Sequence, residues 1–327
     1  MADSDETARA LWYVGPGRAE IREERLAALA PGAVRVRAQH GALSRGTEAL
    51  VAAGRVPVSE FTRMRAPFMD GSFPFPVKYG YATVGRVEAG PAKLLGQTVF
   101  ALHPHQTLFD VPADAAVPLP ASVPATRAIL AANMETALNA LWDAGSGPFG
   151  CVAIVGAGVV GSLVGFLCKR LASADVTLVD INASRAKVAH ALGLRFATPD
   201  AAPTECDLVV HTSASAAGLA TALNLAGDEA TILELSWYGT GEVAAPLGGA
   251  FHSRRLKLVS SQVGKVAPSH RAEWTHGRRL AAAIEHLSDP VLDVLIAPPV
   301  AFDDLPARLP QILAPGSGVL CQRIDYP

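Results

Sequence analysis

Charged and aromatic residues are scarce in this sequence of 327 residues. Lys, Arg, Asp and Glu together make up 18% of it, aromatic residues make up 6%, and the formal net charge is −2. A nearly neutral chain offers no electrostatic attraction to nucleic acid or to an anionic membrane surface. We therefore expect neither nucleic acid nor a membrane among its partners.

Long apolar runs and paired cysteines are missing as well. No apolar run reaches the ~20 residues that span a bilayer, and residues 1–6 are acidic and polar, unlike a secretory leader. The four cysteines form no C-x-x-C pair and have no His at a metal-ligand spacing. These absences predict a cytoplasmic protein whose thiols behave as small buried hydrophobes.

A glycine-rich turn between two apolar runs dominates the middle of the chain. Residues 152–155 are short and β-branched enough to predict a buried parallel strand. The motif G-x-G-x-x-G follows at 156–161, then a helical segment at 162–171 and a second β-branched run at 176–179 that ends on Asp180. This order of strand, glycine turn, helix, strand and acidic residue is the one that a dinucleotide site requires.

The residues of this motif have separate physical roles in such a site. Gly156 allows the tight turn, Gly158 lets the backbone approach the diphosphate, and Gly161 lets helix and strand pack closely. The diphosphate is expected on the free N–H groups at the helix N-terminus. The carboxylate of Asp180 would accept hydrogen bonds from the adenosine ribose and repel a 2′-phosphate, which predicts NAD rather than NADP.

A change in the residue pattern along the chain predicts two domains. From residue 10 to about residue 114, short strands alternate with Gly and Pro, which indicates a compact β-rich barrel. From residue 125 on, an Ala-rich helix at 126–142 leads into alternating strands and helices, the pattern of a doubly wound parallel sheet. We expect an α/β protein with a barrel domain at 1–133 and 266–327 and a dinucleotide-binding domain at 134–265.

The loop between residues 61 and 76 leaves two interpretations open. It carries Phe68, Met69, Phe73 and Phe75 together with three prolines. Such a loop forms a lid over an apolar substrate, or it packs against its own domain.

The domain order and several short motifs resemble the medium-chain dehydrogenase/reductase superfamily. The motifs are P-V-K-Y-G-Y-A at 76–82, T-A-L-N-A-L at 136–141, the glycine turn, and D-I-N at 180–182. The resemblance covers nearly the whole chain and implies a GroES-like barrel joined to a Rossmann domain, with a small-molecule substrate in the cleft between them. It also implies that Thr136 contacts the nicotinamide. The cofactor-binding residues that we predict are Gly156, Gly158, Val159, Val160, Gly161, Asp180, Ile181, Arg185, Thr136 and Ser213.

The zinc ligands of the alcohol dehydrogenases in this superfamily have no counterparts here. Ser44 stands about where the first Cys would be, Tyr81 and Ala82 replace the His and Glu, and Ala132 replaces the later Cys. A catalytic zinc needs about three N or S ligands, so we predict no metal. The stretches 43–48 and 133–137 resemble the zinc-free branch related to bacteriochlorophyllide a dehydrogenase, which implies the reaction type but not the substrate.

Without zinc, a side chain has to handle the proton of the substrate hydroxyl. Tyr81 is attractive because a phenol donates to or accepts from a substrate oxygen, but its pKa near ~10 requires a neighbour such as Lys78 to lower it. The alternative is that Tyr81 only fills the volume of the lost metal. Glu135 could anchor a substrate or a nearby Arg, and Glu48 is expected to pair with a barrel arginine. The predicted catalytic residues are Tyr81, Ser44, Glu135 and Thr47.

Three functions remain open from the sequence. The first is zinc-independent hydride transfer between NAD(H) and a secondary alcohol or ketone. The second is reduction of a quinone or an enoyl group, in which solvent supplies the proton. The third is a sensor that holds a dinucleotide without turning it over, which the lack of a convincing acid–base pair favours.

A homodimer is the last expectation. The resemblance places the strand at 256–263 at the edge of the cofactor sheet, where its exposed N–H and C=O groups would pair with a second copy across a two-fold axis. Arg254, Arg255 and Lys257 could instead keep that edge solvated and the protein monomeric.

Overall fold

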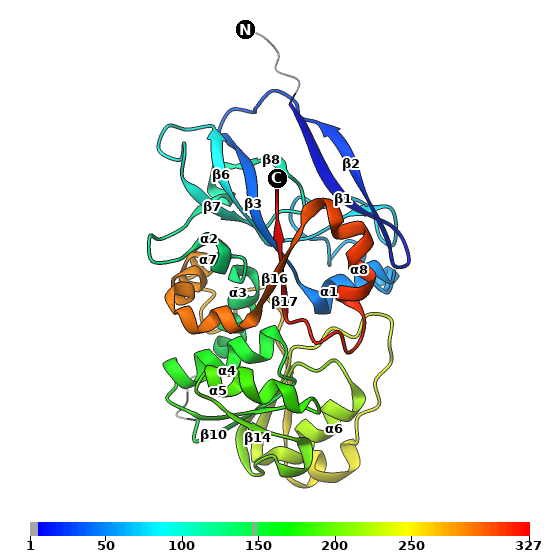
Figure 1. Ribbon diagram of the computed structural model, residues 1–327. Helices are drawn as coiled ribbons and strands as arrows, with labels where there is room; N and C mark the ends of the chain where they lie inside the picture. Colours follow the sequence, from blue (N-terminus) through cyan, green and yellow to red (C-terminus); the bar gives the residue numbers. More distant parts are fainter. Residues whose placement is uncertain (1–5, 146, 148) are drawn as a thin grey trace. The chain divides into compact units, whose positions relative to one another are not determined.

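The computed structural model describes residues 6–145, 147 and 149–327, so most of the acidic start of the chain lies outside the described residues. The chain forms two compact units (Figure 1). Unit 1 comprises Met1–Ala132, Ile284–Ser288 and Ile296–Pro327, and unit 2 comprises Asn133–Ala283 and Asp289–Leu295. The expected domains differ from these units at residue 133, at 266–283 and at 289–295, all of which we assigned to the barrel.

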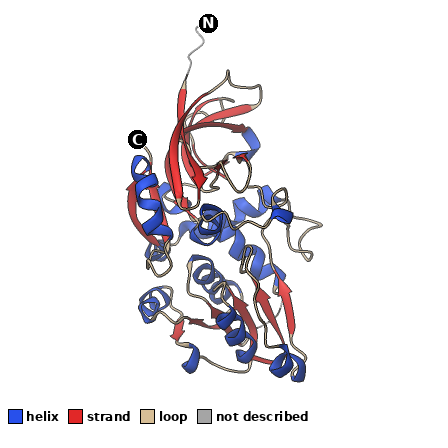
Figure 2. Ribbon diagram, turned by 90° about the vertical axis from the view of Figure 1, so that its right-hand side faces the viewer, coloured by secondary structure: helices blue, strands red, loops and turns tan. Residues whose placement is uncertain are grey.

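Unit 1 is rich in strands, and its strand pairs are antiparallel apart from β16–β17 (Figure 2). One sheet has the order β2-β1-β5-β4, and the other has the order β16-β17-β3-β6-β7-β9 with β8 also paired to β3. The strands are β1 (Thr7–Gly15), β2 (Arg18–Arg25), β3 (Ala33–Leu43), β4 (Asp70–Gly71), β5 (Val77–Lys78), β6 (Thr83–Ala89), β7 (Thr98–Ala101), β8 (Leu108–Pro112), β9 (Val117–Pro118), β16 (Ile296–Ala301) and β17 (Cys321–Asp325).

Alternation along β3 explains the core of unit 1. Val34, Val36 and Ala38 are buried in one apolar cluster, whereas Arg37 between them is exposed and bonds Glu88. A period of two is what a strand with one face on the core requires. The helices that accompany these strands are α1 (Arg45–Ala52), α2 (Ala125–Ala128) and α8 (Leu305–Leu313).

The loop between residues 61 and 76 packs against its own unit. The ring of Phe73 is buried and lies 5.7 Å from that of Phe61 and 5.8 Å from that of Tyr79. Phe68 is partly exposed, but its ring stacks on His103. Of the two interpretations, these contacts favour the one without a lid.

Unit 2 contains a six-stranded parallel sheet of the doubly wound type, as the sequence predicts. Its order is β12-β11-β10-β13-β14-β15, so the chain starts in the middle at β10, builds outward through β11, and then returns to the other side at β13. The strands are β10 (Cys151–Val155), β11 (Asp175–Val179), β12 (Arg195–Ala197), β13 (Cys206–His211), β14 (Ala226–Glu234) and β15 (Lys257–Ser260).

Helices join the strands of unit 2. They are α3 (Ala131–Asp143), which begins at the end of unit 1, α4 (Val159–Leu171), α5 (Ala186–Ala191), α6 (Ala216–Leu225) and α7 (His276–Glu285). Of the helices that the structure describes, none has the length and apolar character that crossing a bilayer requires.

The predicted single helix at 126–142 is wrong in one respect. It is divided into α2 and α3 by Ile129 and Leu130, which lie in a turn. Both side chains are fully buried. Tertiary packing of these two consecutive apolar residues overrides the helical propensity of the Ala-rich sequence around them.

Candidate active site

The glycine turn after β10 has the geometry that its sequence predicts. Gly156 has φ 109°, and a Cβ at this position would lie 2.8 Å from Thr212 Oγ1. A Cβ at Gly161 would lie 2.1 Å from the carbonyl oxygen of Gly156. Side chains are therefore excluded at both positions, and the start of α4 packs directly on the turn.

The N-terminus of α4 is open to an anion. Gly158 is its N-cap, no described side chain caps it, and no atom lies within 4 Å of a Cβ built at Gly158. Val159 and Val160 form the first turn and are half-buried. Free N–H groups together with the helix dipole fit the diphosphate of a dinucleotide.

Asp180 follows β11 and holds the turn in place. One carboxylate oxygen accepts a hydrogen bond from the N–H of Ala157 at 2.8 Å, and the other accepts one from the N–H of Asn182 at 2.8 Å. Each oxygen keeps a second lone pair for a ribose hydroxyl. Ile181 beside it is 88% exposed, and Arg185 is half-buried in the next short helix.

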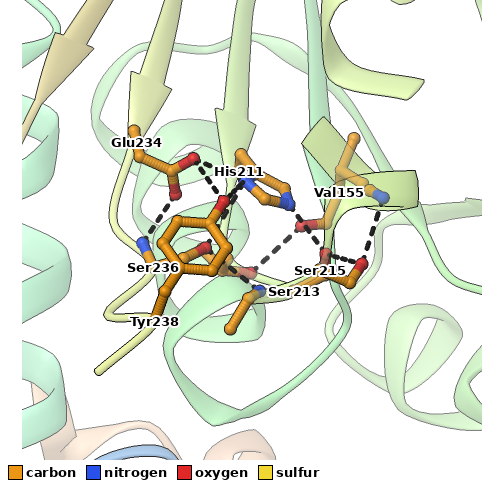
Figure 3. Close-up of polar contacts among 10 residues, drawn as sticks. Val155, His211, Ser213, Ser215, Glu234, Ser236 and Tyr238 are labelled. Atoms are coloured by element: carbon orange, nitrogen blue, oxygen red, sulfur yellow. Dashed lines mark hydrogen bonds and ion pairs between the residues drawn. The ribbon is translucent and has the colours of Figure 1, made fainter. Parts of the chain in front are cut away.

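On the other side of the glycine turn, β13 ends in a polar network that the sequence did not reveal (Figure 3). His211 is buried, and its Nδ1 lies 2.7 Å from Glu234 Oε2, while its Nε2 lies 2.7 Å from Ser213 Oγ. The hydroxyls of Tyr238 and Ser236 lie farther from Nδ1, at 3.3 and 3.4 Å. Ser213 Oγ lies 3.0 Å from Ser215 Oγ, and Ser215 caps α6 by accepting the N–H of Gly218. His211 and Glu234 face each other because β13 and β14 pair in register at these residues.

The carboxylate of Glu234 is held by three donors. Its Oε2 accepts from Tyr238 O–H at 3.0 Å as well as from His211, and its Oε1 accepts the N–H of Ser236 at 2.7 Å. Burial alone would raise the pKa of Glu234, but the hydrogen bonds from His211 and Ser236 hold it below its ordinary value. Burial and the Glu234 carboxylate raise the pKa of Tyr238, so this phenol stays protonated and donates.

In unit 1 the structure brings together three of the four predicted catalytic residues. Tyr81 is hydrogen-bonded to the side chains of Ser44 and Thr47. Burial raises the pKa of the Tyr81 phenol to about 12 against the effect of these two bonds. Lys78 does not lower it as we expected, because its ammonium bonds Glu24 at 2.7 Å and Gln106 at 3.1 Å.

Glu48 does not pair with a barrel arginine as the sequence suggested. Tyr13 O–H donates to its Oε2 at 2.8 Å, His105 Nε2 lies 2.9 Å from the same oxygen, and the N–H of Ser44 donates to its Oε1 at 2.8 Å. Both Glu48 and His105 are fully buried. Glu48 therefore links β1, α1 and the segment before β8 in the core of unit 1.

Glu135, the fourth predicted catalytic residue, lies in unit 2 and forms a buried ion pair. The guanidinium of Arg279 donates to it at 3.0 Å and also bonds Asn139, which joins α3 to α7. Burial raises the pKa of Glu135, and Arg279 only partly offsets this. Glu135 therefore anchors an arginine, one of the two roles predicted for it. Thr136, next in α3, is half-buried.

A metal ion does not fit the described part of the chain. Among these residues, no group of three or more His, Cys, Asp or Glu side chains could hold one. His103 and His105 point to different partners, because His103 bonds the carbonyl of Pro104 and stacks on Phe109, whereas His105 contacts Glu48. We therefore derive no chemical step through zinc.

Comparison with known proteins identifies the fold. No family model and no curated protein matches the sequence. Solved structures match along nearly the whole chain, at identities that establish fold alone. An alcohol dehydrogenase from Escherichia coli in complex with NADH has 15% identity and a TM-score of 0.77, with 98% of this chain and 99% of that chain covered. The chain has the medium-chain dehydrogenase/reductase fold.

Two other structures show how widely this fold is used. 2R,3R-butanediol dehydrogenase from Bacillus subtilis has 14% identity and a TM-score of 0.75, with 97% of this chain and 99% of that chain covered. A putative NADPH:quinone reductase from Bacillus thuringiensis has 14% identity and a TM-score of 0.75, with 98% and 99% covered. Both alcohol and quinone chemistry thus occur on the fold.

Proposed function

We propose that the chain is a zinc-independent oxidoreductase that transfers a hydride between NAD(H) and a secondary alcohol or ketone. The observation that carries the proposal is the glycine turn with the open N-terminus of α4 on one side and Asp180 on the other. A nicotinamide dinucleotide fits this arrangement and would supply the hydride acceptor. We also propose that the chain belongs to the zinc-free branch of the medium-chain dehydrogenases/reductases.

The residues of unit 2 would divide the binding of the cofactor among them. The N–H groups at the start of α4 meet the diphosphate, and Asp180 accepts from the adenosine ribose. Because an acidic residue at this position repels a 2′-phosphate, we expect NADH to bind more tightly than NADPH. Thr136 and Ser213 would contact the nicotinamide half.

The cofactor is tested by fluorescence titration with NADH and with NADPH, alongside elemental analysis of the protein as purified. We expect a lower Kd for NADH than for NADPH, and no stoichiometric zinc. In Asp180→Ser the two Kd values should lie closer together. Gly161→Val should abolish NADH binding because its side chain would clash with the carbonyl oxygen of Gly156 and displace the glycine turn. Stoichiometric zinc, or tighter binding of NADPH by the unmodified chain, would contradict the proposal.

Reduction of a quinone or enoyl group is the second candidate, and the protonated state of Tyr81 favours it. A phenol with a pKa of about 12 donates hydrogen bonds at neutral pH but is a poor base. Alcohol oxidation needs a proton acceptor, whereas hydride addition to an activated C=C can take its proton from solvent.

A substrate screen separates the candidates. Alcohols, aldehydes and quinones, with butane-2,3-diol and benzyl alcohol among them, are followed by the absorbance of reduced nicotinamide. Oxidation of an alcohol by NAD would indicate the alcohol dehydrogenase, and oxidation of NADH by a quinone without turnover of any alcohol or aldehyde would indicate the second candidate. Tight NADH binding without turnover of any compound would indicate a sensor.

The homodimer also stays a proposal, supported by β15. This strand is the last in the sheet, and all four of its residues are exposed in the single chain, including Leu258 and Val259. Light scattering during size exclusion should give twice the chain mass of 34.0 kDa. The N–H of Ser261 bonds Glu234 in β14, so by alternation the N–H of Leu258 faces the open edge. Leu258→Pro should yield monomers and the matched Leu258→Thr, which keeps the N–H, should not; a wild-type monomer across a dilution series would refute the dimer.

A further inference from the structure

The Nε2 atom of the buried His211 is connected to the surface through the hydroxyl of Ser213, whereas the half-buried hydroxyls of Tyr238 and Ser236 lie 3.3 and 3.4 Å from its Nδ1. His211 is fully buried, Glu234 is 14% exposed at its side chain, and Ser213 is exposed. The distances of 2.7 Å on both ring nitrogens are those of short, well-formed hydrogen bonds. A titratable ring that is linked to an exposed hydroxyl has the arrangement of a proton relay.

The protons in this network can be placed from its partners. Hydrogen bonds from His211 and Ser236 depress the pKa of Glu234, so its carboxylate is ionised and accepts only. Nδ1 of His211 therefore carries the proton that Glu234 accepts, and Nε2 is left as the acceptor for Ser213 O–H. Ser215 accepts the N–H of Gly218, which leaves its own O–H free to donate to Ser213.

The network lies on the side of the glycine turn opposite to Asp180, because β11 and β13 flank β10. In a doubly wound sheet the dinucleotide crosses the carboxyl ends of the strands at the switch point, here between β10 and β13. With the adenosine ribose on Asp180 after β11, the other half of a bound dinucleotide would extend toward the end of β13. Thr212 ties that end to the turn, because its hydroxyl donates to the Gly156 carbonyl at 2.8 Å.

We propose that Ser213, His211 and Glu234 form a proton relay for the hydroxyl group whose carbon gives up the hydride. The proposal rests on the function proposed above and supplies the proton acceptor that Tyr81, with its raised pKa, does not. Ser213 and His211 are its catalytic residues, and Glu234 is a positioning residue that fixes the ring tautomer.

Atoms and electrons balance as follows in the direction of alcohol oxidation. The C–H bond breaks with its electron pair, which leaves as hydride to the nicotinamide ring, and the carbon is oxidised to the carbonyl. The O–H bond breaks as its proton passes to Ser213 Oγ while the proton of Ser213 passes to Nε2 of His211. The imidazolium is then stabilised by Glu234, and ketone reduction reverses each transfer.

The same three residue types also form the nucleophilic triad of acyl transfer. The position of Ser213 beside the glycine turn favours the relay over that reaction. A fluorophosphonate probe decides between them, because covalent labelling at Ser213 would identify a nucleophile and overturn the relay.

The test compares His211→Gln, Ser213→Ala, Glu234→Gln and Glu234→Asp with a matched control, His252→Gln, which alters an exposed histidine of the same unit. Proton NMR of the protein without cofactor should show a low-field signal from the Nδ1 proton of His211. This signal should vanish in His211→Gln because the ring is gone. It should also vanish in Glu234→Gln, because the new amide would donate to Nδ1 and the ring proton would move to Nε2. It should persist in Ser213→Ala, Glu234→Asp and the control.

The kinetic arm uses NAD with the alcohol that the screen shows to be oxidised fastest. We expect kcat to fall ~10²-fold in His211→Gln and in Glu234→Gln, with loss of a step in its pH profile and with the Kd of NADH kept. Glu234→Asp should restore most of the rate, and Ser213→Ala should lower both kcat and the solvent isotope effect.

The outcomes separate the two proposals. Wild-type turnover with unchanged kcat and pH profile in His211→Gln overturns the relay and leaves the alcohol chemistry standing. Absence of the low-field signal overturns the assigned hydrogen bond, and with it the relay. A wild-type protein that binds no NADH, or oxidises no alcohol in the screen, overturns the proposed function and the relay together.

Discussion

A buried glutamate in unit 1 and a half-buried one in unit 2 are each held by a tyrosine, a histidine and the backbone N–H of a serine. In unit 1, Glu48 is bonded to Tyr13, His105 and the N–H of Ser44. In unit 2, Glu234 is bonded to Tyr238, His211 and the N–H of Ser236. The donors are the same, and so is the way in which they saturate the carboxylate.

The two clusters differ in what lies beyond the histidine. Nδ1 of His105 is buried and has no hydrogen-bond partner among the described residues, whereas Nε2 of His211 bonds the exposed Ser213. A closed cluster can only stabilise the fold, but an open one can exchange a proton with a ligand. The comparison shows that residue composition does not identify an acid–base site; the connection to the surface does.

The largest expected effect would come from breaking the closed cluster. Glu48→Ala leaves Tyr13 O–H, His105 and the N–H of Ser44 without their acceptor in the core. We expect the free energy of unfolding to fall by about 3 to 5 kcal/mol, measured by urea denaturation. Glu23→Ala, at an exposed glutamate of β2, should change it by less than ~0.5 kcal/mol. An equal change in both variants would show that the cluster is not structural.

The pH dependence of stability sharpens the same contrast, because His103 lies two residues from the closed cluster. Burial lowers its pKa from 6.5 to about 3 in the folded state. Between these values the unfolded chain binds a proton that the folded chain does not, so stability is full above pH ~6.5 and declines as the pH falls toward ~3. In His103→Phe the decline should be shallower. Equal slopes for both proteins in urea titrations over this window would contradict the assignment.

The third prediction disrupts the open cluster without replacing any of its polar residues. A Cβ at Gly218 would lie 2.0 Å from Ser213 Oγ and 2.8 Å from His211 Nε2. Gly218→Ala should therefore displace Ser213 and lower kcat by ~10- to 100-fold, while the low-field proton between His211 and Glu234 remains. Gly277→Ala in α7, where no atom lies within 4 Å of the added Cβ, is the control. Unchanged kcat in Gly218→Ala would argue that Ser213 is dispensable.

Tyr238→Phe should have the smallest effect. It removes one of the three donors to Glu234 and leaves His211 and the N–H of Ser236 in place. We expect kcat to fall by roughly 2- to 5-fold, since one hydrogen bond among several contributes about 1 kcal/mol. A loss as large as that of Glu234→Gln would make Tyr238 itself a proton donor. Tyr238 would then transfer a proton as Ser213 does, and would not only hold Glu234 through a hydrogen bond.

The sequence contained most of the fold because local patterns decide it. The apolar runs at 152–155 and 176–179 and the glycine turn between them occupy the expected positions in unit 2. The elements whose bounds were predicted wrongly depend on packing between residues far apart in the sequence. Ile129 and Leu130 interrupt a helix that their neighbours favour, and the edge strand β15 is shorter than the apolar pattern at 256–263 suggests.

The site was only partly predictable, for a similar reason. The cofactor motif is contiguous, so its glycines and Asp180 were found at once. His211 and Glu234 are separated by 22 residues in the sequence and meet only through the register of β13 and β14. One signal was present: each residue ends a short apolar run, so it falls at the carboxyl end of a strand, the edge where ligands of such sheets bind. The partners of Glu48 gave no comparable signal.

Thr212 separates two kinds of change that a protein engineer would want to make. Its N–H donates to the carbonyl of Val155 and its hydroxyl to that of Gly156, so the glycine turn and the end of β13 move as one piece. Redesign inside the turn would therefore disturb His211 as well as the bound dinucleotide. Asp180 lies on the opposite side of the turn but also holds it through the N–H of Ala157, so the exposed Ile181 beside it is the safer position for retuning cofactor preference.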